Sequence, residues 1–457
     1  MTLKVITPYD QSIYRELEFD TAEEIETKVR DAQTAFARWR RVPLAERVQE
    51  LRKGLDYFRD HQDTIAADIT MQMGKPIREA HNEFGGLFER AEHMLAIAED
   101  TLRPEPLPPQ EGFQRRIERE PLGVVLDIAA WNYPLLIAVN VVVPALAAGN
   151  AVLLKHSAKT PVCGEHFQRA FDHLPGLMTH LVLSHDQTSN LIRDPRIAHV
   201  VFTGSVNGGR HVHRTAAGRF IDVGLELGGK DPAYVADDAD LAFTVPRVVD
   251  GALYNAGQSC CAIERVYVHR KVYDVFIEQA LDALQRFQPG DPMDPGTTLG
   301  PLADPAAMEV LDRQVQDALR RGARLLAGGG RLGGSRGNFY LPTLLADVDT
   351  HAEVMYEESF GPLLPVRSVE DDAEALEQMN ASRYGLTASV WTRSRERAEW
   401  FAARLEAGTV YQNRCDYLDP GLPWTGVKDS GRGSSLSRYG YYALTRTKSI
   451  HFCDGEE

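Results

Sequence analysis

The run Val124-Val125-Leu126-Asp127-Ile128 sets the fold class of this chain. It is short and almost continuously apolar, which is typical of a strand buried on both faces of a parallel sheet. Comparable short runs follow it, with helix-like segments between them, at Ala151–Lys155, Leu181–Leu183 and His199–Phe202. This alternation of strand and helix predicts an α/β fold with a nucleotide-binding layout.

The segments before and after this region are also predicted to be regular. Residues 22–100 have helical periodicity, and we expect the first helix over Ala22–Trp39 with Thr21 as its N-cap. After Asp237 a second alternating unit runs to about residue 412 and includes a predicted helix at Asp304–Arg321. The whole chain therefore belongs to the α/β class.

Length and composition suit a globular protein of two or three domains, with 457 residues, 43% of them hydrophobic and 25% charged. The 50 Lys and Arg against 65 Asp and Glu give a formal net charge of −15. No basic tract interrupts this acidity, which argues against nucleic acid as a partner. Five cysteines, two of them adjacent, fit a reducing compartment better than a disulfide framework.

One apolar segment, Leu135–Leu154, is about as long as a membrane span. Asn140, Pro144 and Gly149 interrupt it, so we predict a buried helix that stops and is followed by a buried strand. No apolar signal core follows the N-terminus. We expect a cytoplasmic protein without a membrane partner.

A small polar turn, Gly257-Gln258-Ser259-Cys260-Cys261, lies between an apolar helix-like run and the strand-like Val266–Val268. Its cysteines could be a nucleophile, half of a metal site or core residues. Metal ligation needs further Cys or His at close spacing, and the other three cysteines stand alone. The turn therefore favours a nucleophile at Cys260 and no metal site. A buried core position remains open for Cys261.

Six motifs in register make the chain resemble the aldehyde dehydrogenase superfamily over nearly its whole length. The cysteine turn matches that family's Gly-Gln-x-Cys nucleophile turn. The other five motifs are Trp131-Asn132-Tyr133-Pro134, Lys155, Phe202-Thr203-Gly204-Ser205, Glu226-Leu227-Gly228-Gly229-Lys230 and Glu357-Glu358-Ser359-Phe360-Gly361-Pro362. The resemblance implies an NAD(P)-dependent enzyme that oxidises an aldehyde to the carboxylic acid.

The resemblance also implies three structural parts. We expect a Rossmann-like cofactor domain (residues 1–102 and 122–235), a catalytic α/β domain (236–433) and a small β oligomerisation element (103–121 and 434–457). Phe113–Glu118 and Thr445–Phe452 alternate as edge strands do, and we expect the second to join a sheet in a neighbouring subunit. A homodimer or a homotetramer is implied, and the sequence leaves both open.

The predicted cofactor turn follows a strand and opens a helix. Glycines there let backbone N–H groups approach a pyrophosphate, and the helix N-terminus favours its charge. The local pattern lacks the usual G-x-G-x-x-G spacing and fits a plain turn equally well. By resemblance, Glu358 holds the nicotinamide ribose and Phe360 packs beside the ring. The other residues that the resemblance assigns to the cofactor are Trp131, Gly204, Ser205, Gly209 and Leu227.

Lys155 ends a predicted buried strand, where an ammonium needs an anionic or hydroxyl partner. By resemblance it contacts the adenosine ribose. Three residues later, NAD-preferring relatives usually carry a glutamate that repels a 2′-phosphate, whereas this chain has Ala158, flanked by Ser157 and Lys159. We expect NADP to be accepted as well as NAD, with the preference between them open.

The chemistry implied by the resemblance assigns three catalytic residues. Cys260 attacks the aldehyde to give a thiohemiacetal, and the Asn132 amide stabilises the oxyanion with the backbone N–H of Cys260. Asn132 could equally be a helix N-cap. Glu226 stands in an apolar run, where burial would raise its pKa toward that of a general base for water. Ser435 replaces a glutamate that the family often has, so deacylation is expected to be slower or organised differently.

The predicted substrate pocket is mostly apolar, which favours medium- or long-chain aliphatic, or broadly apolar, aldehydes. Arg414 is the exception, because an inward guanidinium could bind the carboxylate of a semialdehyde such as succinic semialdehyde. Alternatively, Arg414 is solvated or pairs with Asp416. The residues expected to line the pocket are Tyr133, Leu136, Ile137, Asn140, Ser259, Cys261, Arg414 and Trp424.

Two other classes of function compete with an aldehyde-oxidising enzyme. A non-catalytic binding or structural protein on the same fold would be expected to lack Cys260, Glu226 or Asn132, and all three are present. A thiol hydrolase would need a histidine base, and no His adjoins the cysteine turn. The expected partners are a small-molecule aldehyde and further copies of this chain.

Overall fold

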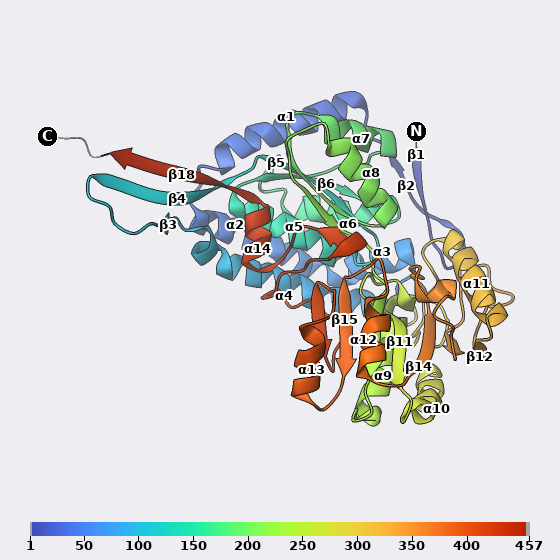
Figure 1. Cartoon of the computed structure of the whole chain (residues 1–457). Coiled ribbons are helices and arrows are strands. Elements are labelled where there is room, and N and C mark those ends of the chain that lie inside the picture. The colour runs from blue at the N-terminus through green and yellow to red at the C-terminus, as the bar shows by residue number, and fades with distance from the viewer. Residues whose placement is uncertain (1, 454–457) are drawn as a thin grey trace.

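Two large sheets organise the structure, a computed structural model that describes residues 2–453 (Figure 1). One sheet has six strands in the order β17-β9-β8-β5-β6-β7, and the other has seven in the order β12-β13-β14-β11-β10-β15-β16. Most neighbouring strands within them run parallel. The α/β class predicted from the sequence is confirmed.

The six-stranded sheet contains most of the strands predicted around Val124. Its members are β5 (Val124–Ala129), β6 (Ala151–His156), β7 (Met178–His180), β8 (Ile197–Thr203), β9 (Val223–Glu226) and β17 (Gly431–Arg432). The strand predicted at Leu181–Leu183 is wrong, because β7 ends at His180. Leu181 and Leu183 are buried, and burial rather than strand geometry explains their apolar character.

Helices α1 to α8 belong to this half of the molecule, and their buried faces share one core with the sheet. Thr21 and Glu24 form a capping box at the start of α1, as the sequence predicts for Thr21. Helix α5 is buried along almost all of its length and ends at Gly149, directly before β6. The helices are α1 (Ala22–Trp39), α2 (Leu44–Asp60), α3 (Gln62–Met73), α4 (Ile77–Leu102), α5 (Pro134–Ala148), α6 (Pro161–Ala170), α7 (His185–Arg193) and α8 (Val206–Ala216).

The apolar segment at Leu135–Leu154 is thus a buried helix and the start of a buried strand, as predicted. Within residues 2–453, no helix is both long enough and apolar enough to span a membrane.

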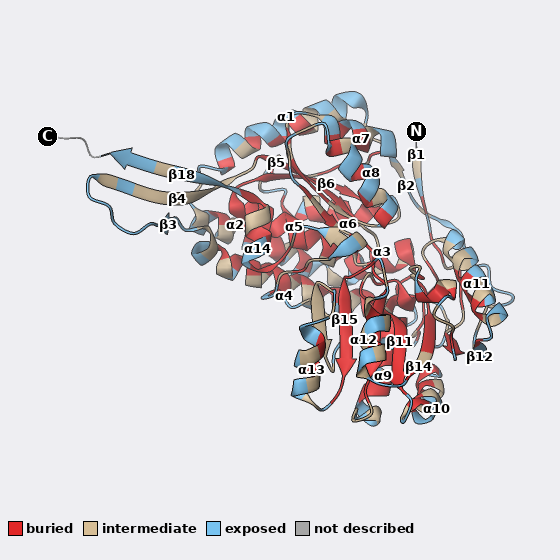
Figure 2. Ribbon diagram, viewed as in Figure 1, coloured by how far each residue is buried: buried red, intermediate tan, exposed pale blue. Residues whose placement is uncertain are grey.

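The seven-stranded sheet forms the other half, and β11 and β15 are buried throughout (Figure 2). Its strands are β10 (Asp231–Val235), β11 (Ile263–His269), β12 (Arg324–Ala327), β13 (Thr343–Ala346), β14 (Leu363–Val369), β15 (Thr387–Trp391) and β16 (Thr409–Gln412). Its helices are α9 (Leu241–Leu253), α10 (Tyr273–Leu284), α11 (Pro305–Arg320), α12 (Asp372–Asn380) and α13 (Arg395–Ala402). The helix predicted at Asp304–Arg321 is α11, with Asp304 as its N-cap.

Strand pairing bears on the predicted domain limits. Strand β10 pairs with β11 and β15, so residues 231–235 belong to the same sheet as the predicted catalytic region rather than to the cofactor sheet. The division into domains otherwise stays a prediction. Residue 1 and residues 454–457, at the ends of the predicted parts, lie outside the described residues.

A three-stranded sheet projects from the body of the molecule as an arm (Figure 1). It consists of β3 (Glu105–Pro106), β4 (Phe113–Pro121) and β18 (Thr445–Cys453), and α14 (Ser437–Ala443) leads into β18. Strand β18 pairs antiparallel with β4 of the same chain, from Thr445 opposite Pro121 to Cys453 opposite Phe113. Both predicted strands therefore exist, and pairing with a neighbouring subunit stays a prediction.

The N-terminal hairpin joins the two halves. It consists of β1 (Thr2–Ile6) and β2 (Ile13–Glu18). At its turn, the carbonyl of Pro8 accepts a hydrogen bond of 2.9 Å from the backbone N–H of Asn338, which belongs to the loop between β12 and β13.

Candidate active site

A cavity of about 790 Å³ brings most of the predicted site residues together. The ends of β5, β8 and β9 contribute to it from the six-stranded sheet. The cysteine turn and the segment before β14 contribute from the other half. The predicted residues that line it are Cys260, Glu226, Asn132, Trp131, Gly204, Ser205, Leu227, Glu358, Phe360, Tyr133, Leu136, Ile137, Asn140, Ser259, Cys261 and Trp424.

The cysteine turn follows a strained 3-10 segment, η1 (Tyr254–Gly257). Asn255 and Ala256 both have φ of 54°, in the left-handed region that costs energy for residues with a side chain. Gly257 is also left-handed, and a Cβ on it would come within 2.3 Å of the carbonyl oxygen of Gly361. A glycine is required there for the turn to approach the segment that carries Glu358.

The two cysteines differ in their surroundings. Cys260 is half-buried and lines the cavity, whereas Cys261 is buried. The Cys261 thiol donates to Asp416 Oδ1 at 3.0 Å, and the Ser259 hydroxyl donates to the same oxygen at 2.8 Å. The neighbouring Cys260, burial and the Asp416 contact, in that order, raise the pKa of Cys261. The surroundings therefore favour Cys260 over Cys261 as the nucleophile.

Asn132 lies between β5 and α5, with its side chain directed at the cysteine turn. Its Nδ2 donates to the backbone carbonyl of Gln258 at 3.1 Å. The alternative that Asn132 caps α5 is wrong, because the N-cap is Tyr133 and that helix has no side-chain cap. The carbonyl of Asn132 itself accepts from Lys75 Nζ at 2.8 Å and from Asn255 Nδ2 at 3.1 Å. These bonds fix the Asn132 amide beside Cys260.

Glu226 is the last residue of β9 and presents its carboxyl group to the same cavity. Burial raises its pKa, while the nearby Ser435 hydroxyl and the Arg90 guanidinium lower it. The direction agrees with the prediction from the sequence. Ser435 thus lies beside the proposed base, although it replaces an acid that the family often has.

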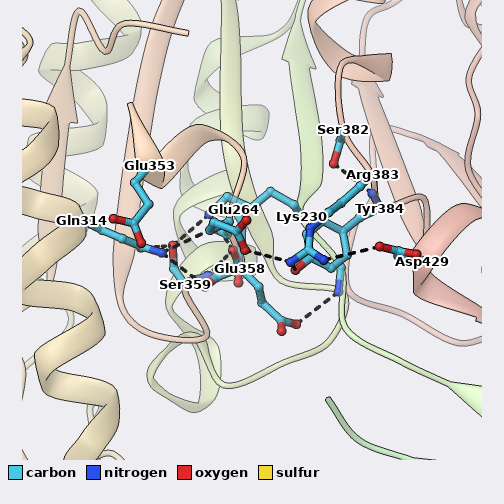
Figure 3. Close-up of polar contacts among 12 residues, drawn as sticks. Lys230, Glu264, Gln314, Glu353, Glu358, Ser359, Ser382, Arg383, Tyr384 and Asp429 are labelled. Carbon is cyan, nitrogen blue, oxygen red and sulfur yellow. Dashed lines mark hydrogen bonds and ion pairs between the residues drawn. The ribbon is translucent and has the colours of Figure 1, made fainter. Parts of the chain in front are cut away.

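A buried ion pair supports the segment that carries Glu358 (Figure 3). Lys230 Nζ lies 2.7 Å from Glu264 Oε2 and donates to the Ser359 hydroxyl at 2.8 Å. Glu264 in turn accepts from the backbone N–H groups of Ser359, at 2.7 Å, and Phe360, at 2.9 Å. The pair therefore fixes the backbone on both sides of the Ser359–Phe360 bond. It holds the segment between η2 (Glu353–Met355) and β14 against β10 and β11.

Glu358 itself lies over the Gly228-Gly229 peptide. Its Oε1 accepts from the Gly229 N–H at 3.1 Å, and a Cβ on Gly228 would come within 2.1 Å of that oxygen. Burial, reinforced by the charge of Glu264, raises the pKa of Glu358 to about 8. A buried carboxyl with one N–H partner and one side open to the cavity can accept ribose hydroxyls.

Aromatic and glycine residues shape the rest of the predicted cofactor site. The rings of Trp131 and Phe360 meet edge to face with centroids 5.6 Å apart. Ser205 caps α8 by accepting from the Gly208 N–H. Gly209 does not line the cavity, because it lies within α8 and lets that helix pack on Leu227. A Cβ on Gly209 would come within 2.5 Å of a Leu227 methyl carbon.

Lys155 has the environment predicted from the sequence. It is 8% exposed near the end of β6, and its ammonium group makes no hydrogen bond or ion pair with any other described residue. Burial lowers its pKa to about 8. A buried ammonium without a protein partner fits the ribose or phosphate oxygens of a nucleotide. Lys155, Ser157 and Ala158 lie beyond the residues that line the main cavity.

The loop after β6 is tied to the other half of the molecule. Lys159 Nζ lies 2.9 Å from Asp304 Oδ2, and Asp304 lines the cavity as the N-cap of α11. Ala158 is exposed on this loop, and the Ser157 hydroxyl accepts from the Lys159 N–H at 3.3 Å. Together with Lys155 and Glu358, this arrangement fits a dinucleotide. The loop itself has no acidic residue that would repel a 2′-phosphate.

The prediction that Arg414 lines the pocket is wrong. Arg414 is exposed, and its guanidinium carbon lies 3.5 Å from the centre of the Tyr417 ring. Stacking on this ring keeps it outside the cavity. It makes no ion pair with Asp416 either, since Asp416 accepts from Ser259 and Cys261 instead.

Arg90 is one of several residues that line the cavity and that the sequence did not single out. It lies on α4 and is 8% exposed. A signal existed in the sequence, because Glu79, Glu83 and Arg90 fall at spacings that place them on one face of a helix. A row of charges on a face that also carries Gly86 indicates a buried polar layer rather than a solvated surface.

Comparison with known proteins finds relatives over nearly the whole chain. A model of the aldehyde dehydrogenase family matches residues 1–450. A Deinococcus radiodurans protein named succinate-semialdehyde dehydrogenase (NADP(+)) is 36% identical over 97% of this chain and 94% of its own length. The Escherichia coli K12 succinate semialdehyde dehydrogenase (NAD(P)+) Sad is 35% identical over 94% of this chain and 93% of its own.

Solved structures give the same result. The structure of succinic semialdehyde dehydrogenase from Streptococcus pyogenes in complex with NADP+ superimposes with a TM-score of 0.94 at 31% identity, covering 98% of this chain and 99% of that one.

Proposed function

This chain belongs to the aldehyde dehydrogenase family, and on that basis we propose that it oxidises a semialdehyde with NADP+ and releases the free acid by hydrolysis. The observation that carries the proposal is the meeting of Cys260, Asn132 and Glu226 in one cavity. The names of the relatives favour the semialdehyde alternative over the apolar aldehydes that the sequence first favoured.

Bond formation begins at Cys260. Its thiolate attacks the aldehyde carbon, a C–S bond forms, and the carbonyl oxygen becomes an oxyanion. One N–H of the Asn132 amide is engaged by the Gln258 carbonyl, which leaves the second N–H to donate to this oxygen. Bound NADP+ or NAD+ supplies the hydride acceptor through which this adduct becomes a thioester.

Hydrolysis then frees the acid. The Glu226 carboxylate takes a proton from a water molecule, and the resulting hydroxide attacks the thioester carbonyl. The C–S bond breaks, Cys260 leaves as a thiolate, and the proton on Glu226 passes to solvent. A carboxyl group whose pKa is raised by burial is suited to this task, because it holds a proton better than an exposed glutamate does.

The cofactor is proposed to bind through the residues described above. Lys155 would hold the adenosine ribose, Ser205 and the α8 N-terminus the pyrophosphate, and Glu358 the nicotinamide ribose. Ala158 removes the repulsion that a carboxylate would exert on a 2′-phosphate. NADP+ use is supported by the names of relatives, and NAD+ use stays compatible with them.

Assembly is proposed to use the three-stranded arm. Strand β18 lies at the edge of that sheet, with only β4 beside it among the strands of residues 2–453. An exposed edge offers unpaired backbone groups to another chain. A homo-oligomer in which this edge is covered is the expected state.

The function is tested by following reduced cofactor when the protein is mixed with succinic semialdehyde or hexanal, using NADP+ and NAD+ separately. We expect turnover, with succinic semialdehyde and NADP+ giving the highest kcat/KM. Cys260→Ala should abolish it, while Cys453→Ala, at an exposed thiol on β18, should not. A Cys260→Ala protein that still forms reduced cofactor would refute the covalent mechanism.

A further inference from the structure

The guanidinium of Arg90 is a buried charge that is compensated only in part, by charges of Cys261, Glu226 and Glu83 beyond ion-pair distance. It is 8% exposed, and no carboxylate lies within ion-pair distance of it in the described part of the chain. Its Nη1 donates to the carbonyl of Leu136 at 3.2 Å and to Asn140 Oδ1 at 3.3 Å. The other guanidinium nitrogens make no hydrogen bond with described residues. A guanidinium has five N–H donors, so most of its capacity is unused.

Arg90 lies in the wall of the cavity, where its unused N–H donors can meet a ligand. Arg90 lines the cavity between α4 and α5, next to Gly86, and Leu136 and Asn140 line the same wall from α5. Of the described residues that line the cavity, Arg90 alone is an Arg or Lys. An anion that enters beside Cys260 therefore meets one fixed cation.

Glu226 acts on Arg90 through its charge without forming an ion pair, and three other acidic residues of the cavity are engaged elsewhere or neutral. Asp416 accepts from Ser259 and Cys261. Glu89 accepts from the Tyr417 hydroxyl at 2.7 Å. Burial, with the charge of Asp416, raises the pKa of Asp250, which favours its neutral form. None of these acids pairs with Arg90.

Burial of a charge without a counter-ion is costly, and burial lowers the pKa of Arg90 accordingly. Such a residue is stabilised when a ligand brings the missing anion. A planar guanidinium matches a carboxylate in geometry and can bind it through two parallel hydrogen bonds.

We propose that Arg90 binds the carboxylate of the semialdehyde and thereby selects it over neutral aldehydes of the same length. The assignment rests on the proposed function, since it takes Cys260 as the site where the aldehyde end reacts. It gives Arg90 the role that the sequence had suggested for Arg414. Asn140 is then a positioning residue, because its Oδ1 holds the guanidinium in the wall of the cavity.

A competing role for Arg90 is purely electrostatic. Its charge lowers the pKa of Glu226, and charges on Cys261 and Glu226 act in turn on Arg90. If this were its whole role, replacing it would affect every aldehyde alike. The two roles therefore predict different results: an electrostatic role affects all aldehydes equally, and carboxylate binding affects only the semialdehyde.

The experiment compares three aldehydes with a four-carbon chain: succinic semialdehyde, butanal and 4-(trimethylammonio)butanal. Steady-state kcat and KM are measured with saturating NADP+ for the wild type, Arg90→Met, Arg90→Lys and Arg414→Met. Arg90→Met removes the charge and keeps an unbranched chain of similar length. Arg414→Met is the matched control, an arginine lost from outside the cavity.

We expect Arg90→Met to lower kcat/KM for succinic semialdehyde by at least about tenfold, through KM, as the loss of a charge-assisted bond implies. The loss for butanal should be much smaller, limited to the effect of the missing charge on Glu226, and Arg414→Met should match the wild type for both. Arg90→Lys should recover part of the loss. Succinate should inhibit the wild type competitively and Arg90→Met more weakly.

Other outcomes overturn the proposal in distinguishable ways. If the wild type prefers succinic semialdehyde and Arg90→Met keeps that preference, Arg90 is not the anchor, while the proposed function stands. An equal loss for succinic semialdehyde and butanal, with a shifted pH profile, would assign Arg90 to Glu226 instead. If the wild type itself prefers butanal or the cationic aldehyde, the semialdehyde function fails, and the Arg90 assignment falls with it. If Arg90→Met does not fold, Arg90→Lys is compared with the wild type instead. Weaker selectivity for succinic semialdehyde and weaker inhibition by succinate would support the assignment, and wild-type values of both would overturn it.

Discussion

The buried ammonium of Lys75 donates a hydrogen bond of 2.8 Å to the backbone carbonyl of Asn132. Lys75 also pairs with the buried carboxylate of Glu83 and lies 3.9 Å above the Tyr133 ring. Glu83 in turn accepts from the backbone N–H of Leu135, in the first turn of α5. The residue proposed to stabilise the oxyanion is thus held by an ion pair that never touches substrate.

Replacing Lys75 should therefore affect both stability and rate. Lys75→Met leaves Glu83 buried and unpaired, which should cost about 3 kcal/mol in the free energy of unfolding. The double variant Lys75→Met, Glu83→Gln should regain stability but keep a low kcat, because Asn132 remains unsupported. Denaturant unfolding and steady-state kinetics check this. A double variant with wild-type kcat would show that the pair only stabilises the fold.

Ser435 should influence the pKa of the proposed base, Glu226. Its hydroxyl lowers the pKa of Glu226, which burial raises. Ser435→Ala should therefore raise that pKa further and move the acidic limb of the kcat profile to higher pH, with the loss greatest at low pH and recovered at high pH. Ser434→Ala is the neighbouring control. An unmoved acidic limb in Ser435→Ala would contradict the assignment of Glu226 as the base.

The loop after β6 should decide between cofactors. Ala158→Glu places a carboxylate on an exposed loop position near Lys155. We expect it to weaken NADP+ binding at least about tenfold, through repulsion of the 2′-phosphate, and to change NAD+ binding little. Titration of both cofactors gives the two Kd values. Equal changes in both would refute a 2′-phosphate site at Ala158.

Asp304 should compete with the 2′-phosphate for the Lys159 ammonium. Asp304→Asn removes the charge that Lys159 now faces at 2.9 Å, and Asn also serves as an N-cap for α11. The freed ammonium should bind NADP+ several-fold more tightly, and Lys159→Ala should weaken it. NAD+ is the control ligand, for which neither change should matter. Tighter NAD+ binding in Asp304→Asn would point to a general opening of the cleft.

Local chemistry made much of this fold predictable from the sequence. Thr21 with Glu24 marks the start of α1, and Asp304 with Pro305 marks the start of α11. Short apolar runs located β5, β6 and β8. The cysteine turn was recognisable because Gly257-Gln258-Ser259-Cys260 matches the family's Gly-Gln-x-Cys motif. Its left-handed residues Asn255 and Ala256 carry no such signal.

Features that depend on long-range contacts were not predictable. The helical spacing of Arg90 with Glu79 and Glu83 indicates one shared face, but only packing places Arg90 in the cavity and Arg414 on Tyr417. The strand at Asp231–Val235 directly follows the cofactor sheet in sequence, yet it pairs with β11 and β15. Oligomeric state and cellular location stay predictions.

The division of labour between Cys260 and Glu226 is tested most directly by Glu226→Gln. This variant should still form the thioester but be unable to activate water. Rapid mixing with succinic semialdehyde and NADP+ should then give a burst of about one NADPH per subunit, followed by almost no turnover. Intact-mass analysis should find one succinyl group, and it should be absent when Cys260→Ala is added. Steady turnover at the wild-type rate without a burst would contradict the account.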